Sequence, residues 1–277
     1  MSHYRITSLR LGELYLPHGG SVMRDPVHCW LVRGDGRNIL VDSGMADIPT
    51  IHKRLRVQGT GGGHPALVAA LAGEGLTPAD ISHVVLTHMH FDHADNLDLF
   101  PDACVVVQRA ELLAGVDPVP SQRVFYWKST LDNLMARKRP AQLMLLDGDH
   151  QLFPGIRLLS VPSHTEGMQV VIVDTAKGKA AIVSDLGDHY RYWFPADARA
   201  TSHPQRSLTG AYLTGNIRSE SERDWQRAMR RVQDNSDIVI PAHDFRIPRN
   251  IPDEWFAIPD STDGDLAHEP PEPAASA

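Results

Sequence analysis

The stretch THMHFDHADN, residues 87–96, gathers three histidines and two aspartates directly after the apolar run VVL. His88 and His90 stand two residues apart, so their side chains point the same way if the strand geometry continues to them. Asp92 and His93 follow at the next bend. Burying so many polar side chains costs several kcal/mol unless they are paired or bound. Imidazole and carboxylate groups together suit a metal such as zinc, so the stretch predicts a metal site at the end of a strand.

Three further polar residues stand in the same position, just past the end of an apolar run that is typical of a strand. His164 follows IRLLSV, Asp185 follows AAIVS and His243 follows DIVI. Strand ends on one edge of a sheet are where a scaffold gathers a site. Four ligands within residues 88–93 cannot close around one ion without strain. We therefore expect these three residues to complete the ligand set, with a second ion as an open possibility.

Strand and helix signals alternate along the chain. Asp35-Gly36 between two apolar runs predicts a hairpin, and Pro65 opens a helix that ends at Gly73 or Gly75. Apolar residues at helical spacing predict another helix over 124–135. Val- and Leu-rich runs predict strands at 81–87, 103–108, 142–146, 156–161, 169–174, 180–184 and 237–240.

A further helix begins near Ser219, which forms a capping box with Glu222. The mixture of strands and helices predicts an α/β domain over residues 1–260, in which sheets pack together and helices lie outside. Residues 261–277 are rich in Pro, Ala and acidic residues without an apolar pattern. They are predicted to form a disordered tail.

Composition excludes several classes of partner. The net charge of −7 comes without a long Lys/Arg block, which argues against a nucleic-acid partner. No apolar run is long enough to span a bilayer, and the first residues lack the apolar core of a signal peptide, so we expect a cytoplasmic protein with no membrane partner. Cys29 and Cys104 lie in apolar runs and are predicted to be buried free thiols.

The motifs THMHFDH, PSHTEG, SDLGD and PAHD together resemble the signature of the metallo-β-lactamase superfamily, and LVDSG at residues 40–44 is similar to an early element of that family. The order of the motifs most resembles the quorum-quenching N-acyl-homoserine lactonases. The resemblance covers residues from about 28 to 250, nearly the whole predicted domain. It implies a four-layer αβ/βα sandwich with metals at one sheet edge.

The resemblance also implies two divalent ions, expected to be zinc, held by two sets of ligands. The first set is His88, His90 and His164, and the second is Asp92, His93 and His243. Asp185 would bridge the two ions together with a hydroxide. Asp42, from LVDSG, would orient a ligand histidine, although a turn-capping aspartate explains this position equally well.

The sequence departs from the family pattern at three places. Ala94-Asp95-Asn96 replaces Ala-Gly-Gly and can cap the following helix through its polar side chains, and Ser163 replaces a glycine. The acyl-homoserine lactonases carry a tyrosine three residues after the bridging aspartate, whereas Asp188 stands here. Tyr190 would fill that role from a longer loop, with His189 as its competitor and ordinary packing as the alternative. The predicted catalytic residues are Asp92, Tyr190 and His189.

The resemblance implies a hydrolase that opens a lactone, such as an N-acyl-homoserine lactone, by attack of the bridging hydroxide. A glyoxalase II-like thioesterase is the first alternative. A β-lactam hydrolase, a nuclease, an iron redox protein and a non-catalytic binding module follow. The expected partner is a small-molecule lactone or ester, and a homodimer is left open. Two segments would wall the pocket: 120–136 with Phe125, Tyr126 and Trp127, and 189–195 with Tyr190, Tyr192, Trp193 and Phe194. The apolar stripe at 124–135 is more typical of core packing than of a pocket wall.

Overall fold

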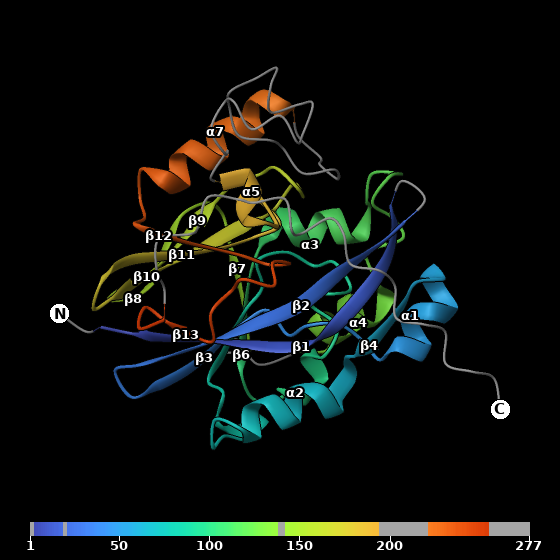
Figure 1. Cartoon of the computed structure of the whole chain (residues 1–277), viewed down its shortest axis with the longest axis horizontal. Helices are drawn as coiled ribbons and strands as arrows, with labels where there is room; N and C mark the ends of the chain where they lie inside the picture. The colour runs from blue at the N-terminus through green and yellow to red at the C-terminus, as the bar shows by residue number, and fades with distance from the viewer. Residues whose placement is uncertain (1–2, 19–20, 138–141, 194–220, 255–277) are drawn as a thin grey trace.

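The computed structural model describes residues 3–18, 21–137, 142–193 and 221–254, which form two β-sheets that pack face to face (Figure 1). The larger sheet has eight strands, in the order β13 (Asn250–Ile251), β1 (Arg5–His18), β2 (Ser21–Gly34), β3 (Arg37–Val41), β5 (His83–Val85), β6 (Cys104–Gln108) and β7 (Leu143–Leu146), with β4 (Gln58–Gly61) paired to β1. The smaller sheet has five strands, in the order β12 (Ile238–Pro241), β11 (Gly178–Ser184), β10 (Gln169–Thr175), β9 (Ile156–Ser160) and β8 (His150–Phe153).

The hairpin between β2 and β3 turns at the predicted pair. Asp35 has φ 51° and Gly36 has φ 70°, and positive φ at both central residues is the geometry of the two-residue turn that matches strand twist. Pairing continues from Gly34 with Arg37 to Trp30 with Val41. The hairpin prediction is therefore confirmed.

Strand β2 shows how the layers form. Trp30 and Val32 point into the core between the two sheets, whereas Cys29 and Leu31 point to the opposite face and contact the helical layer. This follows from the two-residue repeat of a strand. All four side chains are fully buried, and full burial of one large aliphatic side chain contributes roughly 1.5–3 kcal/mol to folding.

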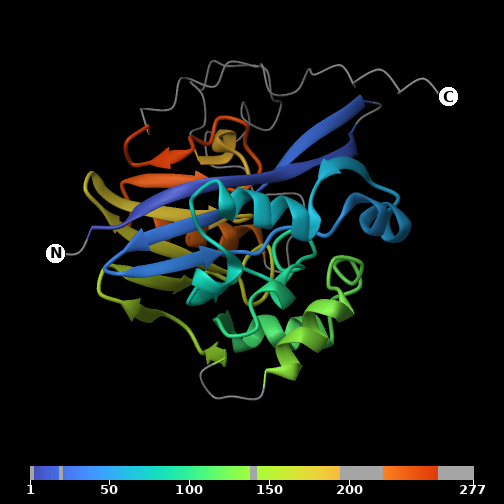
Figure 2. The same cartoon turned by 90° about the horizontal axis from the view of Figure 1, so that it is seen from below.

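Helices cover both outer faces. The larger sheet is covered by α2 (Gly63–Ala72), α3 (Arg109–Val116) and α4 (Lys128–Ala136). The smaller sheet is covered by α5 (Tyr190–Trp193) and α7 (Glu222–Gln233). Figure 2 shows α2 lying across the strands of the larger sheet. The order helix, sheet, sheet, helix confirms the predicted four-layer αβ/βα sandwich.

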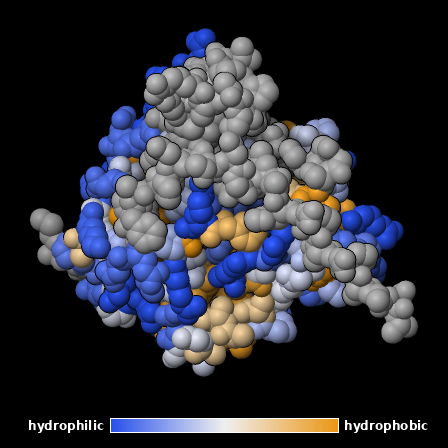
Figure 3. Space-filling view, in the orientation of Figure 1, coloured by the Kyte–Doolittle hydropathy of each residue, from blue (hydrophilic) through white to orange (hydrophobic). Residues whose placement is uncertain are grey.

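Three short elements complete the described chain: α1 (Ile48–Leu55), η1 (Pro78–Asp80) and η2 (Leu97–Leu99). Helix α1 packs beside the β1–β2 hairpin, in a small apolar cluster with Leu14, Phe91 and Trp127. Hydrophilic residues predominate on the face seen in Figure 3, and an apolar area at its lower edge lies over α2. Within the described ranges, no helix is long and apolar enough to cross a membrane.

Two helix starts differ from prediction. Helix α4 begins at Lys128 rather than 124, because Tyr126 forms a β-bridge with His90 and the Phe125 carbonyl accepts a hydrogen bond from Phe91 N. Helix α7 is capped by Ser221, whose hydroxyl accepts from Asp224 N. The pattern Ser-x-x-acid occurs twice, two residues apart, and the predicted cap Ser219 lies outside the described residues.

The remaining predictions concern the end of α2, the cysteines, the cap at Asn96 and the tail. Helix α2 ends before Gly73, as predicted, and both cysteines are buried free thiols, as predicted. Asn96 does not cap η2 with its side chain; it donates instead to the carbonyls of Ser43 and Met45, at 2.8 and 2.9 Å. The predicted tail, 261–277, and Phe194 lie outside the described residues, and the domain boundary at 260 stays a prediction.

Candidate metal centre

Strand direction brings the predicted ligands to one edge. Strands β9, β11 and β12 all run the same way, because β10 is antiparallel to both β9 and β11 while β11 is parallel to β12. Their carboxyl ends therefore meet at one edge, where His164, Asp185 and His243 follow them. Residues 87–93 follow β5 of the facing sheet, and Thr87 O accepts a hydrogen bond from Gln169 N across the sandwich. All seven predicted ligands meet at this edge.

The seven side chains fall into groups that could each hold an ion. In each group, one potential ligand atom per residue lies within 4.8 Å of the others. The groups are His88, His90 and His164; His88, His93 and Asp185; and Asp92, His93 and His243. The first and third groups are the two sets implied by the family resemblance.

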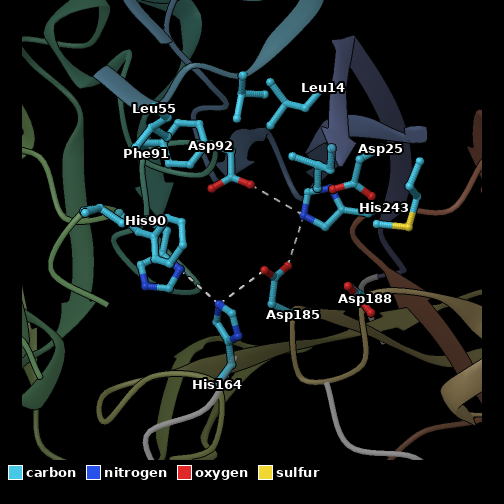
Figure 4. A pocket seen from close by; sticks show the side chains of 15 residues that line it. Leu14, Asp25, Leu55, His90, Phe91, Asp92, His164, Asp185, Asp188 and His243 are labelled. Carbon is cyan, nitrogen blue, oxygen red and sulfur yellow. Dashed lines mark hydrogen bonds and ion pairs between the residues drawn. The ribbon is translucent and has the colours of Figure 1, made fainter. Parts of the chain in front are cut away.

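Asp185 stands between these two sets (Figure 4). Its Oδ1 lies 3.3 Å from Nε2 of His93 and 3.3 Å from Nε2 of His243. Its Oδ2 lies 3.3 Å from Nε2 of His164 and 3.9 Å from Nε2 of His88. One oxygen therefore faces each set, which is the arrangement that a bridging carboxylate requires.

The donor set fits divalent ions. The Nε2 atoms of His88 and His93 and the Oδ1 atom of Asp185 are buried and make no hydrogen bond with any described residue. A buried polar atom without a partner is costly, so such atoms indicate a missing ligand. Imidazole nitrogens and carboxylate oxygens are the donors that zinc accepts.

Electrostatics favour the ligand forms of His88, His90 and Asp185. For His93 and His243, burial alone would lower the pKa, but the neighbouring carboxylates hold it well above its ordinary value in the absence of an ion. Burial and the neighbouring His93 hold the pKa of His88 well below its ordinary value, and burial and His164 do the same for His90. Burial alone would raise the pKa of the Asp185 carboxyl, but the imidazoles of His93 and His243 hold it well below its ordinary value. Neutral imidazoles and an ionised carboxylate are the states that bind a metal.

Asp42 acts on a predicted ligand. Its Oδ2 accepts from His93 Nδ1 at 2.9 Å and from the Thr87 hydroxyl at 2.8 Å, and its Oδ1 accepts from Thr87 N at 2.7 Å. Because Nδ1 of His93 donates to Asp42, Nε2 keeps its lone pair and points to the site. Asp42 therefore orients a predicted ligand histidine rather than only capping a turn. Its φ of 58° is unusual for a non-glycine residue and typical of functional sites.

His243 is oriented in a similar way by the backbone. Its Nδ1 donates to the Pro26 carbonyl at 2.9 Å, which leaves Nε2 directed at Asp185 and, at 3.7 Å, at Asp92. Gln122, which is buried, donates to the His164 carbonyl and restrains that loop. The segments that carry His93, His164 and His243 are thus each restrained by a contact from a distant part of the chain.

The sequence matches the family model of the metallo-β-lactamase superfamily over residues 22–243. The chain belongs to this superfamily. The resemblance inferred from the motifs is therefore confirmed.

The superfamily relatives include lactonases. A Bacillus cereus N-acyl homoserine lactonase is 29% identical over 175 residues, which cover 60% of this chain and 65% of the lactonase. Metallo-beta-lactamase domain-containing protein 1 from Homo sapiens is 28% identical over 188 residues, which cover 66% of this chain and 56% of that protein. The chain thus spans less than two thirds of the length of these curated relatives.

Solved structures support the fold. An N-acyl homoserine lactone hydrolase, determined with the product N-hexanoyl-L-homoserine at its catalytic metal center, has a TM-score of 0.65 to this structure at 21% identity. The match covers 88% of this chain and 95% of that chain. At this identity the likeness shows the metallo-β-lactamase fold alone.

In this protein, a cavity of about 330 Å³ opens over the candidate metal centre. It is lined by Leu14, Leu16, Met23, Asp25, Leu55, Val57, His90, Phe91, Asp92, Val124, Phe125, His164, Asp185, Asp188 and His243. Of the predicted wall residues described here, Phe125 lines the cavity. Tyr126 and Trp127 do not: the Tyr126 hydroxyl bonds to Glu111, and Trp127 stacks on Phe91.

Most of the cavity wall was not predicted. It comes from the β1–β2 hairpin and from residues around the end of α1, which have no motif and reach the site through long-range packing. Asp25 on β2 was also missed. Its Oδ2 lies 3.5 Å from Nδ1 of His243. Burial raises the pKa of Asp25 to about 6. The alternating apolar residues of β1 were the available signal, but they indicate a strand without indicating what it covers.

The two side chains predicted to assist catalysis lie behind the cavity. Tyr190 is 2% exposed, its backbone N–H donates to Asp244 at 3.0 Å, and the Arg246 guanidinium stacks on its ring. His189 Nδ1 lies 3.2 Å from Asp188 Oδ1. Neither Tyr190 nor His189 lines the cavity, whereas Asp188 does. Tyr192 and Trp193 are buried in the cluster beneath α7.

Proposed function

We propose that this protein is a hydrolase with two divalent ions, expected to be zinc, that opens a lactone. The observation that carries the proposal is the position of Asp185, with one oxygen toward each set of ligands. His88, His90 and His164 would hold one ion, and Asp92, His93 and His243 the other. Asp185 would contact both.

Two divalent ions held in these positions supply a hydrolytic nucleophile from water at neutral pH and polarise an ester carbonyl. The chain's own contribution is positioning. Asp42 and the Pro26 carbonyl fix the ring orientations of His93 and His243, so the donor atoms are pre-arranged before substrate arrives. The cavity binds the remainder of the substrate and keeps water away from its apolar part.

The cavity wall favours a lactone with an apolar substituent. Eight lining residues are apolar, and they come from β1, β2, the end of α1 and residues 91–125. The N-acyl homoserine lactonases among the relatives support such a substrate. An N-acyl-homoserine lactone is therefore the first compound to test.

The charge of the cavity disfavours the thioesterase alternative. The lining residues described here include four aspartates and no lysine or arginine. A glutathione thioester carries carboxylates that a cation would have to pair with, since an unpaired buried charge is costly.

We assign Tyr190 no contact with the substrate, because it lies behind the cavity wall. Asp92, which lines the cavity and faces His243, keeps the predicted place beside the reacting atoms. The location in the cytoplasm, the lack of a nucleic-acid partner and the homodimer stay predictions.

The test is a substrate panel on protein of measured metal content. It contains N-acyl-homoserine lactones of increasing chain length, a simple γ-lactone, S-lactoylglutathione and a β-lactam. We expect lactone turnover to exceed thioester and lactam turnover by at least roughly tenfold, a difference of about 1.4 kcal/mol in transition-state stabilisation. Preferred thioester turnover, or no turnover of any lactone by the metal-loaded protein, would refute the proposal.

A further inference from the structure

Glu111 is a fully buried carboxylate that the metal ligands do not touch. It lies in the first turn of α3 and is 0% exposed. Four groups donate hydrogen bonds to it: Met89 N at 2.8 Å, the Tyr126 hydroxyl at 2.9 Å, the Thr165 hydroxyl at 2.7 Å and Gly167 N at 3.1 Å. Burying a charge costs several kcal/mol unless hydrogen bonds satisfy it. These four bonds offset part of that cost, although burial still raises the pKa of Glu111.

The two oxygens of Glu111 serve different segments. Oε1 accepts from Met89, which lies between His88 and His90, and from Tyr126. The Tyr126 ring packs edge-to-face on His90, with ring centroids 4.9 Å apart. Oε1 therefore holds the segment that carries two ligands of the first set.

Oε2 accepts from Thr165 and Gly167, which follow the third ligand of that set, His164. The approach is close: a Cβ at position 167 would lie 2.0 Å from Glu111 N, so only glycine fits there. The planar carboxylate thus joins the His88–His90 segment to the His164 loop at a fixed separation.

We propose that Glu111 is a positioning residue that sets the geometry of the first set of ligands, His88, His90 and His164, without touching the metal. No hydrogen bond between described residues links Glu111 to Asp92, His93 or His243. Asp42 holds His93 of that set, and its other bonds go to Thr87, beside His88. If Glu111 only stabilised the fold, its substitution would weaken metal binding by both sets alike. This inference rests on the proposed two-ion function. It says which residue holds the first set of ligands in position.

The test is metal binding by Glu111→Gln. Glutamine keeps the shape of glutamate, but its NH₂ group must face an obligate N–H donor, either Met89 N or Gly167 N. Zinc is titrated against a competing chelator, and ¹⁵N-histidine NMR follows His90 and His243, one from each set. Glu166→Gln is the matched control, since it makes the same change at an exposed position in the loop that carries His164.

We expect Glu111→Gln to bind one equivalent of zinc as the wild type does, and the other at least roughly tenfold more weakly, the lower end of losses seen when groups behind metal ligands are changed. The His90 signals should report the weak step and the His243 signals the tight one. Glu166→Gln should match the wild type. If Glu111→Gln does not fold, Thr165→Val and Tyr126→Phe each remove one of the four bonds and should weaken the same step to a smaller degree.

Unchanged binding of both equivalents, or equal weakening of both, would overturn the inference and leave the proposed function standing. A wild-type protein that binds fewer than two equivalents would overturn the proposed function, and the inference with it.

Discussion

The two halves of the metal centre are restrained in different ways. The second set of ligands is restrained directly, because the Asp42 carboxylate accepts from the Nδ1–H of His93. The first set is restrained indirectly, because the Glu111 carboxylate bonds to residues beside the ligands rather than to the ligands. A direct bond fixes the tautomer and ring orientation of one ligand. An indirect bond fixes the distance between two loops, which matters where the ligands come from separate segments.

Asp185 joins the two halves, so Asp185→Ala should have the largest effect. Removing it takes one ligand oxygen from each set. Bound metal should fall below one equivalent, and turnover should fall by roughly a thousand-fold or more, since the bound ions provide several kcal/mol of transition-state stabilisation. Metal analysis and the lactone assay measure both. Asp147→Ala, at an exposed carboxylate, is the control. If Asp185→Ala retained two equivalents of metal, the two sets of ligands would bind their ions without Asp185.

Asp42→Asn tests the direct restraint. Asparagine places an NH₂ group where either Thr87 or His93 now donates, so His93 loses its fixed tautomer. We expect the second set to bind zinc roughly 10- to 100-fold more weakly, the usual cost of losing a partner behind a metal ligand. The first set should be weakened less, because Asp42 reaches it only through Thr87, the residue before His88. Chelator competition gives the affinity of each step. If zinc bound more weakly to the first set than to the second in Asp42→Asn, the assignment of Asp42 to the second set would be wrong.

Leu16→Ala leaves both restraints intact and changes the cavity wall. Each methylene lost from an apolar contact costs about 0.8 kcal/mol, so KM for a long-chain acyl lactone should rise roughly three- to thirtyfold. The kcat and the metal content should not change, because binding is lost equally from ground and transition states. A fall in kcat with constant KM would place Leu16 near the reacting atoms. A short-chain lactone is the internal control.

Tyr190→Phe should have the smallest effect. Tyr190 lies outside both ligand sets and behind the cavity, and the change removes one hydroxyl while keeping the ring that packs on Arg246. We expect turnover within about threefold of wild type, well below the roughly hundredfold loss typical of a removed oxyanion donor. A loss of that size at constant metal content would restore the role that the sequence suggested for Tyr190.

The same comparison explains what could be predicted from sequence. His88, His90, Asp92 and His93 lie in one local motif. The remaining three ligands each follow a strand that its own composition identifies. Parallel strands carry their ends to one edge, so local patterns were enough to predict that these side chains lie together.

The parts that sequence did not reveal depend on distant contacts. Asp42 stands in a recognisable motif at a strand end, whereas Glu111 lies in an ordinary-looking helix and meets Thr165 from 54 residues away. The wall residues of β1 reach the site by packing alone. Helix α4 starts late because Tyr126 pairs with His90, a contact that helical spacing cannot reveal.

We propose that the chain holds two divalent ions at the edge where the predicted ligands from its two sheets meet. Metal analysis of protein purified without chelators and freed of unbound ions tests this proposal. Close to two equivalents of zinc, or of a similar divalent ion, are expected per chain. One equivalent or none, found consistently in folded protein supplied with zinc, would contradict the proposal.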